Sequence, residues 1–449
     1  MEAGILRPPS HRPAEPVADR ASGVLTHVLE QHVEDAAALR RIRSRVVRAP
    51  HVRLADLARL DERIAAHLDG IAIAGREGAR MGIQALERMG KGELFTAAIA
   101  CIEWQSNPAL LRLIALGQAV PGALPGLYSA FGWVSAARLA GVVSTLLACD
   151  DPAARFAGLE GCLQHRVDPK RHLDTAFVSE VPVLRALALR CAGDIGRIDQ
   201  LDACRSCFND TDASCRFHAA RSALLLGDRE AALDVIREIS STSSIFSDAA
   251  LALEMNVLPA ADSDRWLEQL AAKQVDARRL IHAIGFTGNT RYVQSLIGHM
   301  RDDRLARLAG ESFSLITGAD LVALQLVRPP SKATTTDDGE SLELADDEDD
   351  GAPWPDPDKI AAWWDANKAR MPCDERHLVG GLLSEAQCFS VLQHGAQRQR
   401  AAAAMQLRLA DPRSVLFNCA APAWRQRRTL QAMRGRASNA DLRVSNGTA

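Results

Sequence analysis

The sequence of 449 residues has 53 basic and 56 acidic side chains and a formal net charge of −3. This balance argues against a strong overall attraction to nucleic acid or to an anionic membrane surface. Apolar residues make up 47% of the chain but aromatic residues only 4%, a composition typical of closely packed helices. The chain is longer than the roughly 250–300 residues at which a single core stops growing, so we expect several units or a repeat array.

Residues 1–22 are rich in Pro, Arg and Glu and lack the apolar core of a signal peptide, which predicts a disordered lead into the fold. No uninterrupted apolar run reaches the roughly 20 residues that a membrane span needs. The ten cysteines are irregularly spaced, as expected for reduced thiols. We therefore predict a soluble, cytoplasmic protein.

Residues 23–149 show apolar side chains at helical spacing, interrupted by Gly, Pro or Asn. This pattern predicts an N-terminal helical region of degenerate repeats. The expected helices cover residues 23–47, 54–73, 78–89, 93–104, 109–119 and 134–148.

A clearer repeat occupies residues 150–327, where the aligned Arg155, Arg185 and Arg216 are 30 and 31 residues apart. Weaker copies follow, one of them with Arg279 at the same place in the pattern. An Asp, Thr or Ser opens each copy as a helix cap, and small residues at Gly158, Ala188 and Ala219 allow close helix packing.

Each copy reads as a helical hairpin. Gly193-Asp194 and Gly227-Asp228 are predicted to end the first helix, and a second helix follows, for example over residues 229–239. Because one hairpin cannot bury its apolar face alone, the copies are expected to stack as an α-solenoid within an all-α fold.

Residues 328–356 interrupt this pattern. Nine of the fourteen residues from Asp337 to Asp350 are acidic, which predicts a disordered linker; an acidic lure for a basic partner is the alternative. Helical patterns return over residues 357–435, with expected helices at 387–408 and 423–433, and predict a C-terminal helical module. Residues 436–449 are predicted to be a flexible tail.

The copies of about 30 residues resemble HEAT-like repeats of the short type found in phycobilisome-lyase-like proteins. A second resemblance covers most of the chain and is to a proteobacterial family of uncharacterised HEAT-repeat proteins. It rests on Leu57-x-x-Leu60-Asp61-Glu-Arg63-Ile-Ala-Ala-His67-Leu68-Asp69-Gly70, Ala362-Trp363-Trp364, Arg376-His377-Leu378-Val379-Gly380-Gly381 and Gly395-x-Gln397-x-Gln-Arg400-x-Ala-Ala403. Members of that family are frequently encoded in type VI secretion gene clusters, which implies an accessory role in effector loading.

A weak candidate for a zinc site is formed by Cys204, Cys207, Cys215 and His218, since two such pairs can supply tetrahedral ligands. The repeat alignment favours another interpretation, in which these residues are small core positions on two successive helices. We therefore expect no metal and no cofactor.

Two sets of residues are candidates for binding a partner. The aligned Arg155, Arg185, Arg216 and Arg279 form either a basic ladder on one face or, as we favour, structural bridges between repeats. Trp363 and Trp364 are hot-spot candidates, with docking of the C-terminal helices onto the solenoid as an equal alternative.

The sequence contains no Gly-x-Ser-x-Gly elbow and no Walker-type phosphate loop, so we expect a protein without catalytic activity. The predicted function is that of a protein-binding scaffold or adaptor, with a secretion effector or a spike-tip protein as its partner. The alternatives are a lyase-like enzyme or prosthetic-group handler and, with less support, a nucleic-acid-binding helical repeat.

Overall fold

The computed structural model describes residues 25–272, 276–330 and 349–446, and within these ranges the fold is all-α and built from helical repeats, as predicted. The one exception among named elements is a short antiparallel hairpin of β1 (His377–Leu378) and β2 (Gly381–Leu382). No helix in the described residues is both long and apolar enough to span a membrane. The lead predicted over residues 1–22 lies outside the described ranges.

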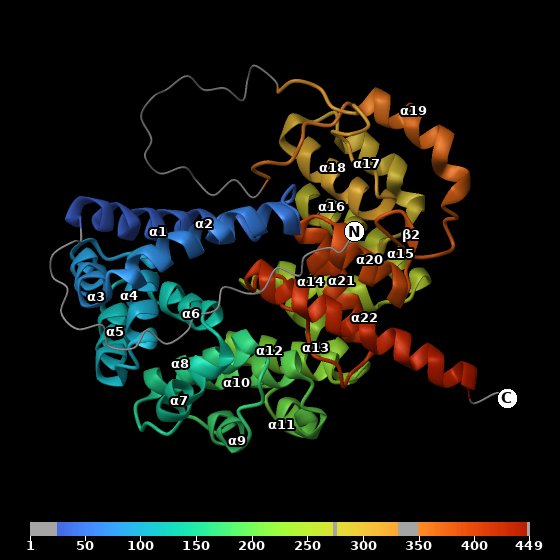
Figure 1. Cartoon of the computed structure of the whole chain (residues 1–449). Helices are drawn as coiled ribbons and strands as arrows, with labels where there is room; N and C mark the ends of the chain where they lie inside the picture. The colour runs from blue at the N-terminus through green and yellow to red at the C-terminus, as the bar shows by residue number, and fades with distance from the viewer. Residues whose placement is uncertain (1–24, 273–275, 331–348, 447–449) are drawn as a thin grey trace. The chain divides into compact units, whose positions relative to one another are not determined.

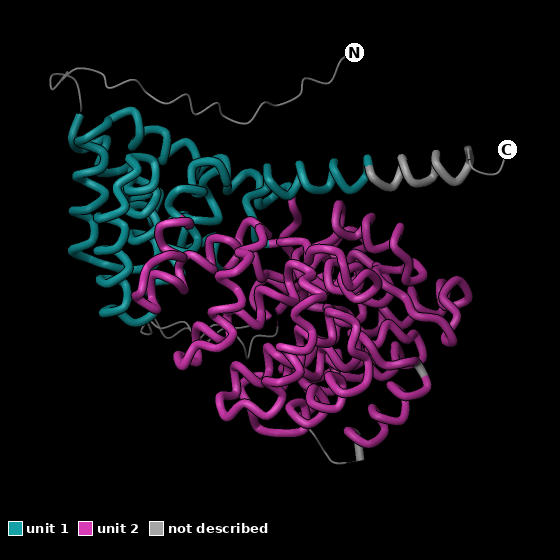
Figure 2. The backbone as a smooth tube through the Cα atoms, turned by 90° about the horizontal axis from the view of Figure 1, so that it is seen from below, with its two compact units in different colours: residues 1–44, 55–142, 420–449 teal, residues 45–54, 143–419 magenta. Residues whose placement is uncertain are grey.

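The chain forms two compact units, coloured separately in Figure 2. Unit 1 comprises residues 1–44, 55–142 and 420–449, and unit 2 comprises residues 45–54 and 143–419. The start of the main part of unit 2 lies close to the boundary expected at residue 150. The expected C-terminal module at 357–435 is divided, because residues 357–419 belong to unit 2 and the remainder to unit 1.

Unit 1 agrees with the expected helices except at two places. A helix over Leu124–Trp133 was not expected, because its apolar residues surround the whole helix and leave no amphipathic period. The last helix continues through Asn446, over most of the predicted tail, since that stretch contains no proline. The helices are α1 (Thr26–Val46), α2 (Leu54–Ile73), α3 (Gly75–Gln84), η1 (Ala85–Arg88), α4 (Lys91–Glu103), α5 (Asn107–Ala119), α6 (Leu124–Trp133), α7 (Ala136–Leu147, which runs on into unit 2) and α22 (Ala423–Asn446).

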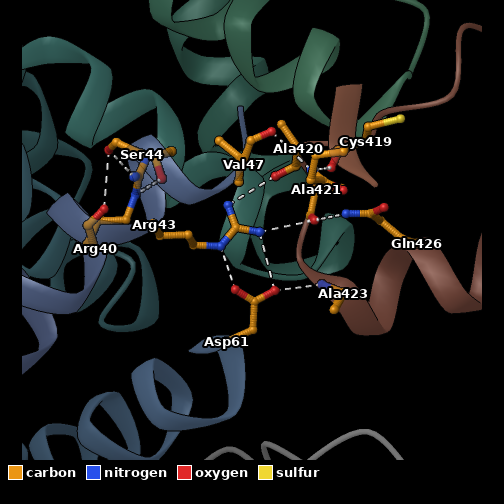
Figure 3. Close-up of polar contacts among 12 residues, drawn as sticks. Arg40, Arg43, Ser44, Val47, Asp61, Cys419, Ala420, Ala421, Ala423 and Gln426 are labelled. Atoms are coloured by element: carbon orange, nitrogen blue, oxygen red, sulfur yellow. Dashed lines mark hydrogen bonds and ion pairs between the residues drawn. The ribbon is translucent and has the colours of Figure 1, made fainter. Parts of the chain in front are cut away.

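A buried ion pair joins α1 and α2 to the start of α22 in unit 1. Arg43 Nε lies 2.5 Å from Asp61 Oδ1, and the side chains are 6% and 0% exposed. Figure 3 shows the guanidinium donating also to the carbonyls of Ala420 and Ala421, each at 3.1 Å. Asp61 Oδ2 accepts a hydrogen bond from the backbone N–H of Ala423 at 2.7 Å and so caps α22 from another helix.

In unit 2, the first helices of successive repeats pack side by side in chain order, as the green-to-yellow ribbons of Figure 1 show. The second helices pack on this first-helix array and enclose one continuous apolar core. The first helices are α8 (Pro152–His165), α10 (Pro182–Ile195), α12 (Ala213–Leu225), α14 (Ser247–Val257), α16 (Ala277–Thr287) and α18 (Asp303–Thr317). The second helices are α9 (Arg171–Phe177), η2 with α11 (Ile198–Gln200, Leu201–Ser206), α13 (Ala231–Ser240), α15 (Ala260–Ala272) and η3 with α17 (Thr290–Tyr292, Val293–His299).

The predicted side-chain caps form on some first helices, but α10 and α14 begin without one, and one predicted helix end is wrong. The side chains of Asp151 and Asp212 accept hydrogen bonds from the first backbone amides of α8 and α12. Helix α10 does not end at Gly193-Asp194; it continues to Ile195 and ends at Gly196, whose φ of 77° favours glycine. Gly193 instead permits close packing, because a Cβ there would lie 2.4 Å from Ser222 Oγ on α12.

The remaining elements of unit 2 are α19 (Pro357–Asn367), η5 (Lys368–Arg370), the hairpin, α20 (Glu385–His394) and α21 (Gln397–Ala410). The single helix expected over residues 387–408 is two helices. They separate at Gly395 and Ala396, which are extended, and the next amide, that of Gln397, bonds to the carbonyl of Val52 at 2.7 Å. We call residues 376–418 the C-terminal arm.

The C-terminal arm runs along the C-terminal ends of the first helices and bonds to their free carbonyl groups. Arg376 donates to the carbonyls of Met255, Asn256 and Thr287 at the ends of α14 and α16. Arg408 donates twice to the carbonyl of Gly193, at 3.0 and 2.8 Å. Further bonds join the arm to the ends of α8, α12 and α18: Arg166 to Leu416 O, Arg229 to Leu409 O, Val379 N to Leu315 O and Gly380 N to Ile316 O.

Both ends of the predicted linker at 328–356 are ordered, which corrects the boundaries of that prediction. Asp349 forms two hydrogen bonds of 2.8 Å with Arg278, and the amide of Arg328 bonds to the carbonyl of Trp354. The apolar contacts and ion pairs at these ends offset the conformational entropy that is lost when the chain becomes ordered. The acidic residues alone could not do so. Most of the acidic run lies outside the described residues.

The close approach at Gly193 generates the first prediction. We expect Gly193→Ala to destabilise the protein by about 1–3 kcal/mol, because the new methyl group overlaps Ser222 on the next first helix. Gly298→Ala is the control, since no atom lies within 4 Å of its added Cβ, and it should be neutral or stabilise by up to about 1 kcal/mol. Urea denaturation measures both. Equal stability of the two variants would contradict the packing argument.

The buried ion pair generates the second prediction. Arg43→Met leaves the carboxylate of Asp61 buried without its guanidinium and should lower the free energy of unfolding by about 3–5 kcal/mol. Arg41 lies on the same helix as Arg43 and forms an ion pair with Glu93, but its side chain is 51% exposed. Arg41→Met should therefore lower the free energy of unfolding by less than about 1 kcal/mol. Chemical denaturation of both variants tests this difference, and similar losses would show that Asp61 does not need its partner.

Candidate functional site

A second ladder of charged residues lies on the first helices, five positions after the arginines that the sequence singled out. Glu160, Arg190 and Arg221 occupy equivalent positions on α8, α10 and α12, and they share the 30- and 31-residue spacing. Because equivalent positions of stacked repeats face the same way, this ladder places three charged groups in a row.

The ladder converges on Asp194, in the last turn of α10, whose side chain is 1% exposed. Arg221 Nη2 lies 2.8 Å from Asp194 Oδ1, while Arg166 Nη1 and Arg190 Nε lie 3.4 and 3.8 Å from Oδ2. Three guanidinium groups from three repeats therefore surround one buried carboxylate, and we call Glu160, Arg166, Arg190, Asp194, His218 and Arg221 the Asp194 cluster.

The electrostatics of the cluster are set by burial and by the arginines. Burial raises the pKa of Asp194, but the positive charges of Arg221, Arg166 and Arg190 outweigh it and hold the pKa well below its usual value. Burial raises the pKa of Glu160, with the charge of Arg190 opposing the shift. Burial also lowers the pKa of His218 to about 3, assisted by Arg221 and Arg190, so its ring is neutral at pH 7.

Two buried nitrogens of the cluster, His218 Nδ1 and Arg221 Nη1, have no hydrogen-bond partner within the described part of the chain. Asp194 Oδ1 is also buried, and its partner is Arg221 Nη2, 2.8 Å away in the ion pair. Buried polar atoms without a partner are rare in folded proteins, and a water molecule or an ion is one kind of partner that can satisfy them. The Arg190 side chain is 44% exposed, against 12% for Arg221, so the cluster reaches the surface through Arg190.

Three of the four aligned arginines bond to carboxylates or carbonyls of neighbouring elements, as the structural interpretation predicts, and one does not. Arg185 makes a two-pronged ion pair with Asp210 at 2.7 and 3.0 Å, Arg216 bonds to the carbonyl of Phe208 and pairs with Glu238, and Arg279 bonds to the carbonyl of Ser240 and pairs with Asp248. Arg155 is the exception, because its buried Nε has no hydrogen-bond partner among the described residues. A role of these arginines in binding a partner stays a prediction.

The two tryptophans proposed as hot spots pack on the repeat array. Trp364 is 8% exposed and joins the apolar core, while Trp363 meets Phe313 edge to face with ring centroids 5.8 Å apart. These contacts match the interpretation in which the C-terminal helices dock onto the solenoid. Helix α19, which carries both tryptophans, lies beside α17 (Figure 1).

Two of the weak zinc candidates, Cys204 and Cys215, are buried in the core, and Cys207 and His218 are partly buried. Burial raises the pKa of Cys204 and of Cys215 to about 12, so both remain thiols at pH 7. Cys215 Sγ donates to the carbonyl of Pro182, and Cys207 is partly buried at the end of α11. His218 lies against Phe246. Across the described ranges, no three His, Cys, Asp or Glu side chains are grouped to hold a metal ion.

The segments that carry the family resemblance supply structural contacts. Asp61 caps α22, Arg376 caps α14 and α16, and Gln397 Nε2 donates to the carbonyls of Val47 and Cys419. Arg400, fully buried, donates to the carbonyl of Leu392 at 2.7 Å. These residues hold the arm and the helix ends in place.

Sequence reasoning missed Arg190, Arg221 and Arg166 and took Asp194 for part of a helix end. The signal for the first two was present, since they repeat with the same spacing as Arg185 and Arg216. Arg166 gave no such signal, because it sits at the left-handed C-cap of α8 and reaches Asp194 through the stacking of repeats. No family model matches this chain, and neither a curated protein nor a solved structure is significantly similar to it.

The lowered pKa of His218 generates the third prediction. The unfolded chain protonates this ring near pH 6.5 and the folded chain only near pH 3, so its stabilising contribution is complete above pH 6.5 and falls as the pH drops toward 3. We expect His218→Gln to lose about 1 kcal/mol less stability than the parent between pH 6 and pH 5.

Urea denaturation at both pH values measures the difference. His27→Gln is the control for the replacement of a histidine as such, because His27 is exposed at the start of α1. Parallel pH profiles for parent and His218→Gln would show that the ring is protonated in the folded protein.

Proposed function

We propose that this chain is a protein-binding scaffold without catalytic activity, and that it binds its partner along one edge of the first-helix array. The observation that carries the proposal is an asymmetry between two edges. The C-terminal ends of the first helices are occupied by the C-terminal arm. The opposite edge carries Val178, Val183 and Ile245, which are 81%, 63% and 90% exposed.

The three apolar residues lie near the N-terminal ends of two first helices, α10 and α14. Val178 follows α9, Val183 lies in the first turn of α10, and Ile245 precedes α14 by two residues. All three therefore lie at the N-terminal ends of first helices, along an extended edge of the kind that helical-repeat proteins use for recognition. Apolar side chains of this size favour a partner with apolar contacts of its own.

The resemblance of residues 57–70 and 376–403 to a HEAT-like family encoded near type VI secretion genes supports a partner class. We propose a secretion effector or a spike-tip protein, met in the cytoplasm before export. Charge balance supports a protein partner over nucleic acid, since the formal net charge is −3.

The test compares two triple variants of the tagged full chain in pull-downs from cells that express its neighbouring genes, with bound proteins identified by mass spectrometry. Val178→Ser, Val183→Ser and Ile245→Ser together should reduce recovery of the bound effector or tip protein by roughly tenfold or more. The control combines Val322→Ser, Leu382→Ser and Val415→Ser, which are comparably exposed but lie at the arm side, and it should retain the partner.

Thermal unfolding should show that both variants are folded, because all six side chains are exposed. Retention of the partner by the first variant would refute binding along this edge. Failure of the parent chain to capture any product of the neighbouring genes would refute the scaffold proposal for this partner class.

A further inference from the structure

The Asp194 cluster has the composition of an anion-binding site. We propose that Arg190, Arg221 and His218 bind a carboxylate group where α10 packs against α12, with the exposed Arg190 at the entrance. This inference is independent of the proposed function, because the site joins two neighbouring repeats and shares no residue with the apolar edge.

Positive charge is in local excess around Asp194. Three guanidinium groups, those of Arg166, Arg190 and Arg221, lie within 4 Å of Asp194, and Glu160 is the other carboxyl group of the cluster. Even with both carboxyl groups ionised, one positive charge is left over in a largely buried place. Charges in such a place are normally paired, because removing them from water without a partner is unfavourable.

Arg408 adds to this excess but is occupied elsewhere. Its guanidinium donates to the carbonyl of Gly193 at 3.0 and 2.8 Å and to the carbonyl of Asp411 at 2.9 Å. These carbonyls include the negative end of the α10 dipole, which accommodates a cation. The unmatched charge therefore belongs to the arginines around Asp194.

The cluster also contains hydrogen-bond donors without an acceptor. Arg221 Nη1 is buried without an acceptor, and the neutral ring of His218 has an unbonded Nδ1 that donates when it carries the ring proton. Arg190 is 44% exposed, and its charge lies close enough to act on the ring of His218. A carboxylate has two oxygens and matches guanidinium donors two at a time.

The charge count favours a monoanion over a phosphate dianion. A single carboxylate neutralises the excess of one, whereas a second negative charge would face the buried carboxylate of Asp194 without compensation. A carboxylate can come from a small free acid or from an acidic side chain of a protein, and both present the same group to the arginines.

The experiment is isothermal titration of the full chain with three probes: acetate, inorganic phosphate and the capped tripeptide acetyl-Gly-Glu-Gly-amide. We expect acetate or the tripeptide to bind with a Kd on the order of 1 mM, and phosphate to bind more weakly. Acetate binding alone assigns the site to a small free acid, and tighter binding of the tripeptide assigns it to an acidic protein side chain.

Arg190→Gln should weaken carboxylate binding by roughly tenfold or more, because it removes the exposed guanidinium of the site. Arg205→Gln is the matched control: Arg205 is 46% exposed, lies on α11 and pairs with Asp228 and Asp202, so binding should not change. Both side chains are near half exposed, so both variants should fold.

A second readout locates the bound group. The side-chain Nε–H signal of Arg221 in nitrogen-15 spectra should shift on titration with acetate in the parent and in Arg205→Gln, but much less in Arg190→Gln. The proposal is overturned if no probe binds saturably, if phosphate binds most tightly, or if Arg190→Gln and Arg205→Gln bind equally well.

Discussion

The repeat array of unit 2 depends on how the carbonyl groups at the ends of its first helices are satisfied. Every α-helix leaves its last carbonyls without a partner inside the helix, and stacked repeats place these groups along one edge. The C-terminal arm supplies donors for them: Arg376 joins α14 to α16, and Arg408 bonds to α10. Because guanidinium has five donors and a positive charge, it suits carbonyls at the negative end of helix dipoles.

The Asp194 cluster lies where this capped edge meets the charged ladder of the first helices. Leu416 of the arm bonds to the carbonyl of Asp194, and Arg166 bonds both to the arm and to the Asp194 carboxylate. Arg166 thus connects the arm, which caps the backbone of α10, to the ion pairs between repeats. Removal of one of these arginines leaves the buried Asp194 carboxylate with fewer cationic partners, which destabilises the fold. An added negative group instead pairs with the arginines of the cluster.

The repeat itself was predictable, because its physics is local. The caps at Asp151 and Asp212 and the 30-residue period require only neighbouring residues. The arm was not predictable from pattern, since Arg376 and Met255 are far apart in the chain and nothing near either one indicates the other. The same holds for Asp61 and Ala423 in unit 1. Within the site, the spacing of Arg190 and Arg221 was visible, but their convergence on Asp194 needed the stacking of helices.

The arm has a consequence for how the chain folds during synthesis. The first helices leave the ribosome in order from α8 to α18, but residues 376–418 that bond to their ends follow only after the whole array has been made. The nascent array therefore passes through a stage in which its edge carbonyls face water, and closure depends on contacts of long sequence separation, which form slowly. Chaperone engagement and misassembly of this protein should concentrate in that interval.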